Sequence, residues 1–348
     1  MPDKYQQIVG AIHIHSNYSD GTKTIPEIAN LANEVGLDFI MITDHMTLEP
    51  YQQGLEGFYG KTAVLIGYEI NDADDKNHYL AFGLDQTLPS DLKAVDYVRQ
   101  VNKKGGLGII AHPDEVRSKL VKYPGYPWSD WRIEGYDGIE IWNHMSQWME
   151  SLSHWNMLKQ AFMPRRALKS PTNRILKIWD EKSQKQRILG IGSIDVHAYP
   201  YKLGPLRVTI FPYKVQFKAI RTHLLLSNEV KSDFGLYKQA IYDSLRRCRA
   251  FISNYRWGDA AGFEFYCENS AGRAWSGDDL TWEEDSIIMV SLPKYADLKI
   301  IQNGQQYFFG RGREFEIKAS RPGLYRVEVY VRDKGWIFSN HIRIKKRG

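Results

Sequence analysis

Nine side chains of the types that bind metal ions are distributed between residues 13 and 197 of the chain. Most of them follow a short apolar run directly, at the point where a β-strand would end. Imidazoles and carboxylates together are typical ligands of metal ions. We therefore expect one multinuclear metal site at the mouth of an α/β barrel. The nine residues are His13, His15, Asp20, His45, Glu69, His78, His112, Asp195 and His197.

The spacing within this series favours a shared site. His13 and His15 lie two positions apart in an expected strand, and Asp195 and His197 repeat this spacing. Side chains two apart point to the same face of a strand, so each pair can contribute to one ion. Glu69 ends an apolar run, where a carboxylate is costly to bury unless a cation neutralises it. Its two oxygens could bridge two ions.

The composition is that of an ordinary globular protein. The chain has 348 residues, of which 43% are hydrophobic and 25% charged, and its formal net charge is +5. This charge permits an anionic substrate but does not indicate nucleic-acid binding, except of a small nucleotide as substrate. Cys248 and Cys267 are expected to be reduced core thiols, unless the fold brings them together as a disulfide.

The start of the chain is polar and lacks the apolar core of a signal peptide. No apolar run approaches the roughly 20 residues that a membrane helix needs. We therefore expect a cytoplasmic protein that makes no contact with a membrane.

Short apolar runs with helical segments between them predict a mostly parallel sheet. Helices are expected at Ile25–Val35, with Thr24 as the N-cap and Gly36 as the stop, and at Leu92–Lys104. The expected strands are Ile8–His15, Phe39–Thr43, Ala63–Gly67, Tyr79–Leu84, Leu107–Ala111, Gly138–Trp142 and Ile188–Ile194.

Two stretches depart from this pattern. Residues from about 145 to 187 read as a helical insertion, and from about Tyr255 onward short strands alternate with Gly and Pro turns. Such spacing predicts a small antiparallel β-sandwich. We therefore expect a barrel domain over residues 1–254 and a sandwich over 255–348. The strands expected in the sandwich are Ser286–Leu292, Leu298–Gln302, Glu314–Ile317, Leu324–Val331 and Trp336–Ile344.

Six motifs resemble those of the PHP (polymerase and histidinol phosphatase) superfamily, over roughly residues 8–254. They are HIHSNYSDG, ITDH, GYE, HYLAFG, IIAHP and GSIDVH. The resemblance implies a distorted (β/α)7 barrel with a trinuclear metal site that holds two or three zinc, manganese or iron ions. By motif, the first ion would be held by His13, His15, Glu69 and Asp195, the second by Glu69, His78 and His112, and the third by Asp20, His45 and His197.

Two residues beside His45 bear on this resemblance. Met46 stands where many relatives are expected to have Asn or Asp, which leaves the metal set intact but puts the substrate pocket in doubt. Asp44 either orients the His45 ring or caps the segment that follows.

The C-terminal segments GLYRVEVYV and GWIFSN resemble the β-domain that follows the barrel in the carbaryl-hydrolase-like (CehA/McbA) branch. The alternative is a generic sandwich without a catalytic role.

The implied mechanism is hydrolysis by a metal-activated hydroxide, which attacks phosphorus or a carbonyl carbon. Asp195 and His197 are the candidates for catalytic proton transfer to the leaving group. Arg117 is a candidate substrate contact because its planar guanidinium suits phosphate oxygens; it could equally be a solvated loop residue. Asn143 and His144 follow an expected strand and could also contact substrate, although His144 could instead cap the next helix.

Three functions stay open at this point. The first is a metal-dependent phosphoesterase acting on a small phosphorylated substrate. The second is a carboxylic or carbamic ester hydrolase of the CehA type, and the third is a non-catalytic PHP binding module. Retention of all nine ligand positions argues against the third. The expected partner is a small, anionic molecule, and the sequence does not predict an oligomeric state.

Overall fold

The structure is a computed structural model that describes residues 5–117, 124–153, 155–203, 206–227 and 233–347. The chain divides into two compact units. The site unit comprises Val9–Lys169 and Gly192–Thr222, and the C-terminal unit comprises Met1–Ile8, Ser170–Ile191 and His223–Gly348. These units divide the chain at other positions than the expected limit between residues 254 and 255, which stays a prediction.

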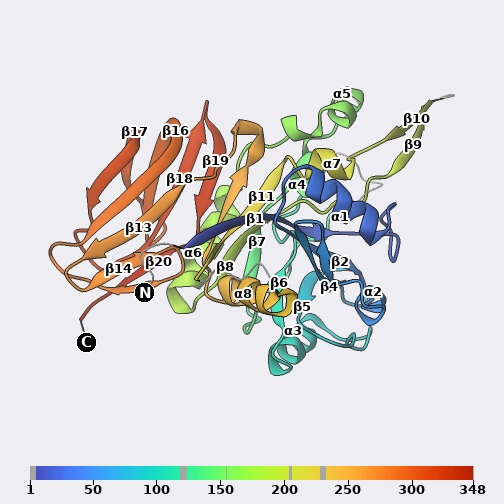
Figure 1. Cartoon of the computed structure of the whole chain (residues 1–348), viewed down its shortest axis with the longest axis horizontal. Coiled ribbons are helices and arrows are strands. Elements are labelled where there is room, and N and C mark those ends of the chain that lie inside the picture. Colours follow the sequence, from blue (N-terminus) through green and yellow to red (C-terminus); the bar gives the residue numbers. More distant parts are fainter. Residues whose placement is uncertain (1–4, 118–123, 154, 204–205, 228–232, 348) are drawn as a thin grey trace. The chain divides into compact units, whose positions relative to one another are not determined.

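A mixed sheet with a parallel core forms the centre of the site unit (Figure 1). β1, β2 and β4 pair in parallel, and β6 pairs in parallel with β7. The parallel core agrees with the mostly parallel order expected, and β5 departs from it by running antiparallel to both β4 and β6. The strands are β1 (Gln6–Ile14), β2 (Phe39–His45), β3 (Gly57–Tyr59), β4 (Thr62–Ile70), β5 (Tyr79–Phe82), β6 (Leu107–Ile110) and β7 (Gly138–Asn143).

The end of β1 also contacts the segment that carries the last predicted ligands. The backbone N–H of Ile194 donates to the carbonyl of Ile12, and that of His15 donates to the carbonyl of Val196, at 3.1 Å each. This parallel contact brings the ends of two distant chain segments side by side. The fold class is thus α/β, as expected, while closure into a seven-stranded barrel stays a prediction.

Helices α1 (Ile25–Glu34) and α3 (Ala94–Lys103) lie where the sequence predicts them. At the start of α1 the side chain of Glu27 accepts a hydrogen bond from the backbone N–H of Thr24, at 2.9 Å, as in a capping box. Each helix buries one apolar face with the spacing of a helical turn. The buried residues are Ile25, Ile28, Ala29 and Ala32 in α1, and Ala94, Tyr97, Val98 and Val101 in α3.

The remaining helices are short, apart from two of 13 residues. The stretch expected to be helical, about 145–187, holds α4, α5, the 3-10 turn η1 and α6. The bounds are α2 (Glu49–Gln52), α4 (His144–Ser151), α5 (Met157–Phe162), η1 (Pro164–Arg166), α6 (Asn173–Lys185), α7 (Tyr213–Gln216), α8 (Phe234–Arg246) and η2 (Tyr255–Trp257).

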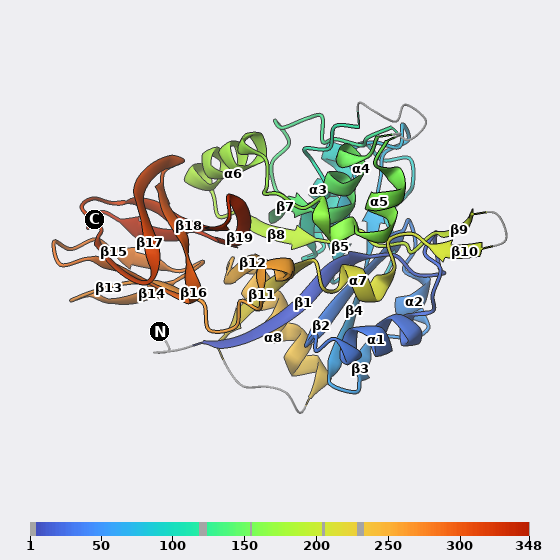
Figure 2. The same cartoon turned by 90° about the horizontal axis from the view of Figure 1, so that it is seen from above.

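The C-terminal unit contains an antiparallel sheet, as the alternating pattern predicts (Figure 2). β16 pairs with β13, β17 and β18, and β18 pairs in turn with β19 and β20. The other strands of the chain are β8 (Leu189–Ser193), β9 (Pro200–Leu203), β10 (Leu206–Thr209), β11 (Ile220–Leu226), β12 (Ala250–Asn254), β13 (Glu264–Asn269), β14 (Gly272–Trp275), β15 (Asp279–Thr281), β16 (Ile287–Gln302), β17 (Gln305–Lys318), β18 (Gly323–Val331), β19 (Lys334–Ser339) and β20 (Ile342–Lys345).

Two of the expected strands, Ser286–Leu292 and Leu298–Gln302, are parts of the single strand β16. Its register against β17 shifts between Ser291 and Ala296, around Pro293, which has no N–H to donate to a ladder. The irregularity therefore interrupts the sequence pattern without ending the strand. Asn303 and Gly304 both have positive φ and turn the chain from β16 into β17, as Asn-Gly does in tight hairpins.

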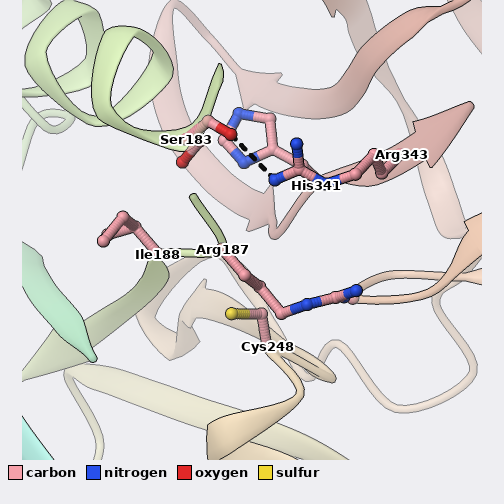
Figure 3. A pocket seen from close by; sticks show the side chains of 7 residues that line it. Ser183, Arg187, Ile188, Cys248, His341 and Arg343 are labelled. Carbon is pink, nitrogen blue, oxygen red and sulfur yellow. Dashed lines mark hydrogen bonds between the residues drawn. The ribbon is translucent and has the colours of Figure 1, made fainter. Parts of the chain in front are cut away.

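Cys248 and Cys267 are buried free thiols, as expected. Cys248 lines a small cavity of the C-terminal unit together with Arg187, His341 and Arg343 (Figure 3). Arg343 donates to the backbone carbonyl of Ser183 there, at 2.8 Å. Among the described residues, no helix is long and apolar enough to cross a membrane.

Candidate metal centre

All nine predicted ligand residues lie together in the site unit. They form four overlapping groups, and in each group one donor atom per side chain lies within 4.8 Å of the others. We call these nine residues the cluster. The groups are His15, Asp20, His45 and His197; His13, Glu69 and His112; His13, His15 and Asp195; and His45, Glu69 and His78.

Glu69 lies at the end of β4, with its side chain only 1% exposed, and its two oxygens face different imidazoles. Oε1 lies 2.8 Å from Nδ1 of His78 and 3.2 Å from Nε2 of His112. Oε2 has its own set of neighbours. These are Nε2 of His13 at 3.1 Å, Nε2 of His15 at 3.3 Å and Nδ1 of His45 at 3.4 Å.

Asp195 lies in the segment that follows β8 and faces His13 and His15, which also face Glu69. Its Oδ1 lies 3.5 Å from Nε2 of His13 and 3.4 Å from Nε2 of His15. His197 lies 3.7 Å from the same oxygen through Nδ1. The first histidine pair and the last motif therefore meet, as their spacing predicts.

Asp20 completes the cluster on its more exposed side. Oδ1 of Asp20 lies 3.2 Å from Nε2 of His197, 3.6 Å from Nδ1 of His15 and 3.8 Å from Nε2 of His45. The turn that carries Asp20 is held by Asp44, which accepts hydrogen bonds from the backbone and hydroxyl of Ser16 and from the hydroxyl of Ser19. Asp44 thus orders this turn. This role differs from both roles considered for it, orienting the His45 ring and capping the segment that follows.

Three cluster residues have left-handed backbone conformations. φ is 67° at His13, 27° at His112 and 50° at Asp195. Such values are uncommon for residues other than glycine, and strained positions of this kind gather at functional sites. The pairing of β1 with β2 also shifts between Ile12 and Ile14. The strand is therefore irregular at His13, while His13 and His15 both face Glu69, as their spacing predicts.

Glu140, in the middle of β7, is a member of the site that the motifs did not reveal. Its Oε1 lies 2.7 Å from Nδ1 of His13, and its Oε2 accepts hydrogen bonds from the backbone N–H of His112 and from Asn143. The one signal in the sequence is a carboxylate inside the apolar strand Gly138–Trp142. A buried carboxylate in such a strand requires a partner.

The carboxylates strongly affect protonation within the cluster. Burial disfavours the imidazolium form, but the carboxylates of Asp195 and Glu69 raise the pKa of His15 to about 9. Burial is likewise outweighed at His78, whose pKa is raised to about 10 chiefly by Glu69. The surroundings therefore favour positive charge, and a divalent cation competes with protons for such a site.

The unpaired nitrogens of the cluster fit a bound metal ion. Both ring nitrogens of buried His15 lack a hydrogen-bond partner among the described residues, as does Nδ1 of His112. Buried polar atoms nearly always have a partner. The donor set of imidazoles and carboxylates around these nitrogens is one that transition-metal ions accept.

Arg117 lies beside the cluster without contacting it directly. Its Nε and Nη2 atoms lie 2.6 and 2.5 Å from Oε1 of buried Glu115. Its guanidinium carbon lies 5.7 Å from the ring centre of Tyr126, whose ring stacks on His78 at 5.0 Å. Arg117 is therefore a paired residue close to the site, and not a freely solvated one.

Asn143 and His144 are not brought into the cluster. Asn143 donates to Glu140 and accepts a hydrogen bond from the backbone N–H of Ser146, which makes it the N-cap of α4. His144 is fully buried, with Nε2 at 3.3 Å from the carbonyl of Pro164, and burial lowers its pKa to about 3. The cap of this helix is thus Asn143, and His144 is its first residue.

Three solved structures match this chain at low sequence identity. A two-domain protein from Bacteroides vulgatus ATCC 8482, containing a predicted PHP-like metal-dependent phosphoesterase, matches with TM-score 0.46 and 17% identity, over 98% of this chain and 97% of that chain. A protein from Bifidobacterium adolescentis ATCC 15703, proposed to be a metal-dependent phosphoesterase, matches with TM-score 0.37 and 16% identity, over 60% of this chain and 94% of its own.

A third similar structure is an amidohydrolase from Chromobacterium violaceum with bound sulfate and no metal. It matches with TM-score 0.32 and 14% identity, over 56% of this chain and 92% of that chain. No curated protein matches the chain significantly. Residues 11–161 match the family model of the PHP domain. This range begins within β1, ends within α5 and includes every cluster residue except Asp195 and His197, so this part of the chain is similar to the PHP domain.

Proposed function

We propose that this chain is a metal-dependent hydrolase that cleaves phosphoric esters of a small, anionic molecule. One observation carries the proposal: the two oxygens of Glu69 face two different sets of imidazoles. A carboxylate in this position suits two ions held side by side, an arrangement used by many phosphoester-cleaving enzymes. The match of residues 11–161 to the PHP domain model supports the same assignment.

The cluster has enough donors for two or three divalent ions, of which zinc, manganese and iron suit the nitrogen and oxygen donors. A divalent ion supplies Lewis acidity, which makes hydroxide available near neutral pH and offsets negative charge in the transition state. We assign one ion to His13, His15, Glu69 and Asp195, a second to Glu69, His78 and His112, and a third to Asp20, His45 and His197.

The protein's own groups orient these donors. Glu140 holds the His13 ring through Nδ1, which leaves Nε2 free to face Glu69. Asp44 fixes the turn that carries Asp20. Misplacing a donor by a fraction of an ångström weakens a metal site. These contacts therefore support metal binding by keeping the donors of His13 and Asp20 in place.

For the proton that the leaving group needs, we propose Asp195 or His197. Both are slightly exposed, at 6% and 7%, so each can reach a substrate at the cluster. Arg117 is our proposed anchor for an anionic group of the substrate, since its guanidinium lies next to Tyr126 beside His78. We assign Asn143 a role in positioning Glu140, to which it donates a hydrogen bond. We assign His144 a role in packing, because it is buried beside the carbonyl of Pro164.

A substrate panel tests the proposal. The metal-free protein is reconstituted with manganese or zinc and offered p-nitrophenyl phosphate and nucleotide phosphates, alongside p-nitrophenyl acetate and aryl carbamates. We expect turnover of phosphoesters that is lost in Glu69→Gln. Turnover of the carboxylic or carbamic esters alone would contradict a phosphoesterase, and no turnover by the loaded protein would favour a binding module.

A further inference from the structure

Tyr199 contacts two members of the cluster at once. Its ring lies parallel to that of His197, with ring centres 5.1 Å apart and an interplanar angle of 12°. Its hydroxyl donates to Oδ2 of Asp20 at 3.1 Å. His197 stacks in turn on His15, at 4.0 Å and 11°. One side chain therefore joins two ligand residues that come from opposite ends of the site unit's sequence.

The ligand group that Tyr199 joins is the most exposed part of the cluster. The side chain of Asp20 is 46% exposed and that of His45 is 31% exposed, against 1% for Glu69. An exposed side chain loses more rotamer freedom when it is fixed for metal binding than a side chain already held by packing. Asp20 directs Oδ1 at the imidazoles, so a bond to Oδ2 is the one that can fix the rotation of its carboxylate.

The backbone of Tyr199 is itself well anchored. Its carbonyl accepts a hydrogen bond from the N–H of Ile210 at 2.8 Å, at the base of the β9–β10 hairpin. The preceding carbonyl, of Ala198, accepts from the hydroxyl of Thr22 at 3.0 Å. These bonds fix the backbone at Tyr199, so its side chain can hold Asp20 and His197 in position relative to the base of the hairpin.

We propose that Tyr199 is a positioning residue for the metal site formed by Asp20, His45 and His197. It holds the carboxylate of Asp20 by its hydroxyl and the imidazole of His197 by its ring. This role rests on the proposed metal centre, but not on the identity of the substrate. Partners that orient metal ligands typically contribute 10–100-fold in metal affinity or activity.

The test compares Tyr199→Phe with Tyr201→Phe in the full chain. Tyr201 is a neighbouring, exposed tyrosine on β9 and serves as the matched control. Metal-free proteins are titrated with Co²⁺, whose visible absorption reports coordination, and with Zn²⁺ by calorimetry. We expect Tyr199→Phe to bind one ion about 10-fold more weakly and the others as in the wild type. Tyr199→Leu, which also removes the stacked ring, should weaken it further, and Tyr201→Phe should match the wild type.

Wild-type affinity for every ion in Tyr199→Phe would overturn the positioning role, whatever the enzyme's activity. A wild-type protein that binds no Co²⁺ or Zn²⁺ would overturn both this role and the proposed function. If the wild type binds ions but hydrolyses no phosphoester, and Tyr199→Phe still weakens one ion, the positioning role stands while the proposed function fails.

Discussion

Nδ1 of His13 lies 2.7 Å from Oε1 of Glu140, and both side chains are fully buried. The contact fixes which nitrogen of the ring is available, since the other, Nε2, faces Glu69 at 3.1 Å. The second oxygen of Glu140 accepts the backbone N–H of His112 at 2.7 Å. One buried carboxylate therefore orients an imidazole of the cluster and the backbone of another ligand residue.

Replacing Glu140 by glutamine should weaken metal binding. The amide keeps the shape of the side chain but removes the negative charge opposite His13, so we expect metal affinity to fall by roughly 10–100-fold. Calorimetric titration of metal-free protein measures the change. Glu150→Gln is the matched control, because Glu150 lies on α4 and accepts from the backbone of Val116 instead of a cluster residue. Equal affinity in both variants would contradict the orienting role of Glu140.

Replacing Glu69 should remove metal and activity together. Glu69→Ala removes the oxygens that face both sets of imidazoles, and Glu69→Gln replaces one oxygen by an NH2 group and removes the negative charge, so the two proposed ion sites lose their shared carboxylate. We expect kcat/KM for phosphoesters to fall more than about 100-fold, beyond the usual effect of a residue outside the ligand shell. Elemental analysis gives the metal content of the same samples. A variant that kept its metal and its rate would show that Glu69 does not bridge.

The sequence alone predicts the nine cluster residues because their positions follow from local patterns. His45 ends β2, Glu69 lies near the end of β4 and His112 follows β6, and in each case an apolar run reveals the strand. The ends of parallel strands meet at one edge of a sheet, so proximity follows from the order of the elements. Helices α1 and α3 were predictable because their apolar residues recur with the period of a helical turn.

The supporting residues could not be found in this way. Glu140 contacts His13 across 127 residues of sequence, and Tyr199 contacts Asp20 across 179, so no local period links either pair. The left-handed backbone conformation at His13 could not be predicted from the sequence either, because nothing in the residue type requires it. These features depend on how distant segments meet.

Removing Arg326 should destabilise the C-terminal unit strongly. Nε and Nη2 of Arg326 each lie 2.7 Å from an oxygen of Asp180, Nη1 lies 2.7 Å from Glu328, and all three residues are buried. Arg326→Met removes the cation that pairs with both buried carboxylates, which typically costs about 3–5 kcal/mol of unfolding free energy. Urea denaturation measures this cost.

Two further variants serve as controls for Arg326→Met. Lys177→Met breaks an exposed ion pair with Glu181 and should unfold like the wild type. The double variant Asp180→Leu/Arg326→Met should be more stable than Arg326→Met alone, since it removes one of the unpaired charges. A single variant as stable as Lys177→Met would contradict the importance of this network.

The buried His341 should make the unfolding free energy depend on pH. Nε2 of His341 lies 2.7 Å from Oδ1 of Asp180, and burial lowers the pKa of His341 below its usual 6.5 despite that carboxylate. As the pH falls below 6.5 the unfolded chain takes up a proton that the folded protein does not, so the unfolding free energy falls. His341→Gln should lack this part of the dependence. Urea denaturation of the metal-free wild type and of His341→Gln at pH 7.5 and 5.5 measures this dependence. The same change in unfolding free energy between the two pH values in both proteins would contradict the role of His341.

The proposed substrate role of Arg117 can be separated by experiment from its pairing with Glu115. Arg117→Met should raise KM for a phosphoester by about 10-fold or more, the equivalent of one hydrogen bond to a charged group, with a smaller effect on kcat. The same change also leaves the buried carboxylate of Glu115 without its partner and should lower the unfolding free energy. Adding Glu115→Gln should restore much of that stability but not the KM, because the amide needs no cation while the substrate still does. If the double variant recovered both quantities, Arg117 would act only by supporting its loop, and the anion would have to be bound by the cluster itself.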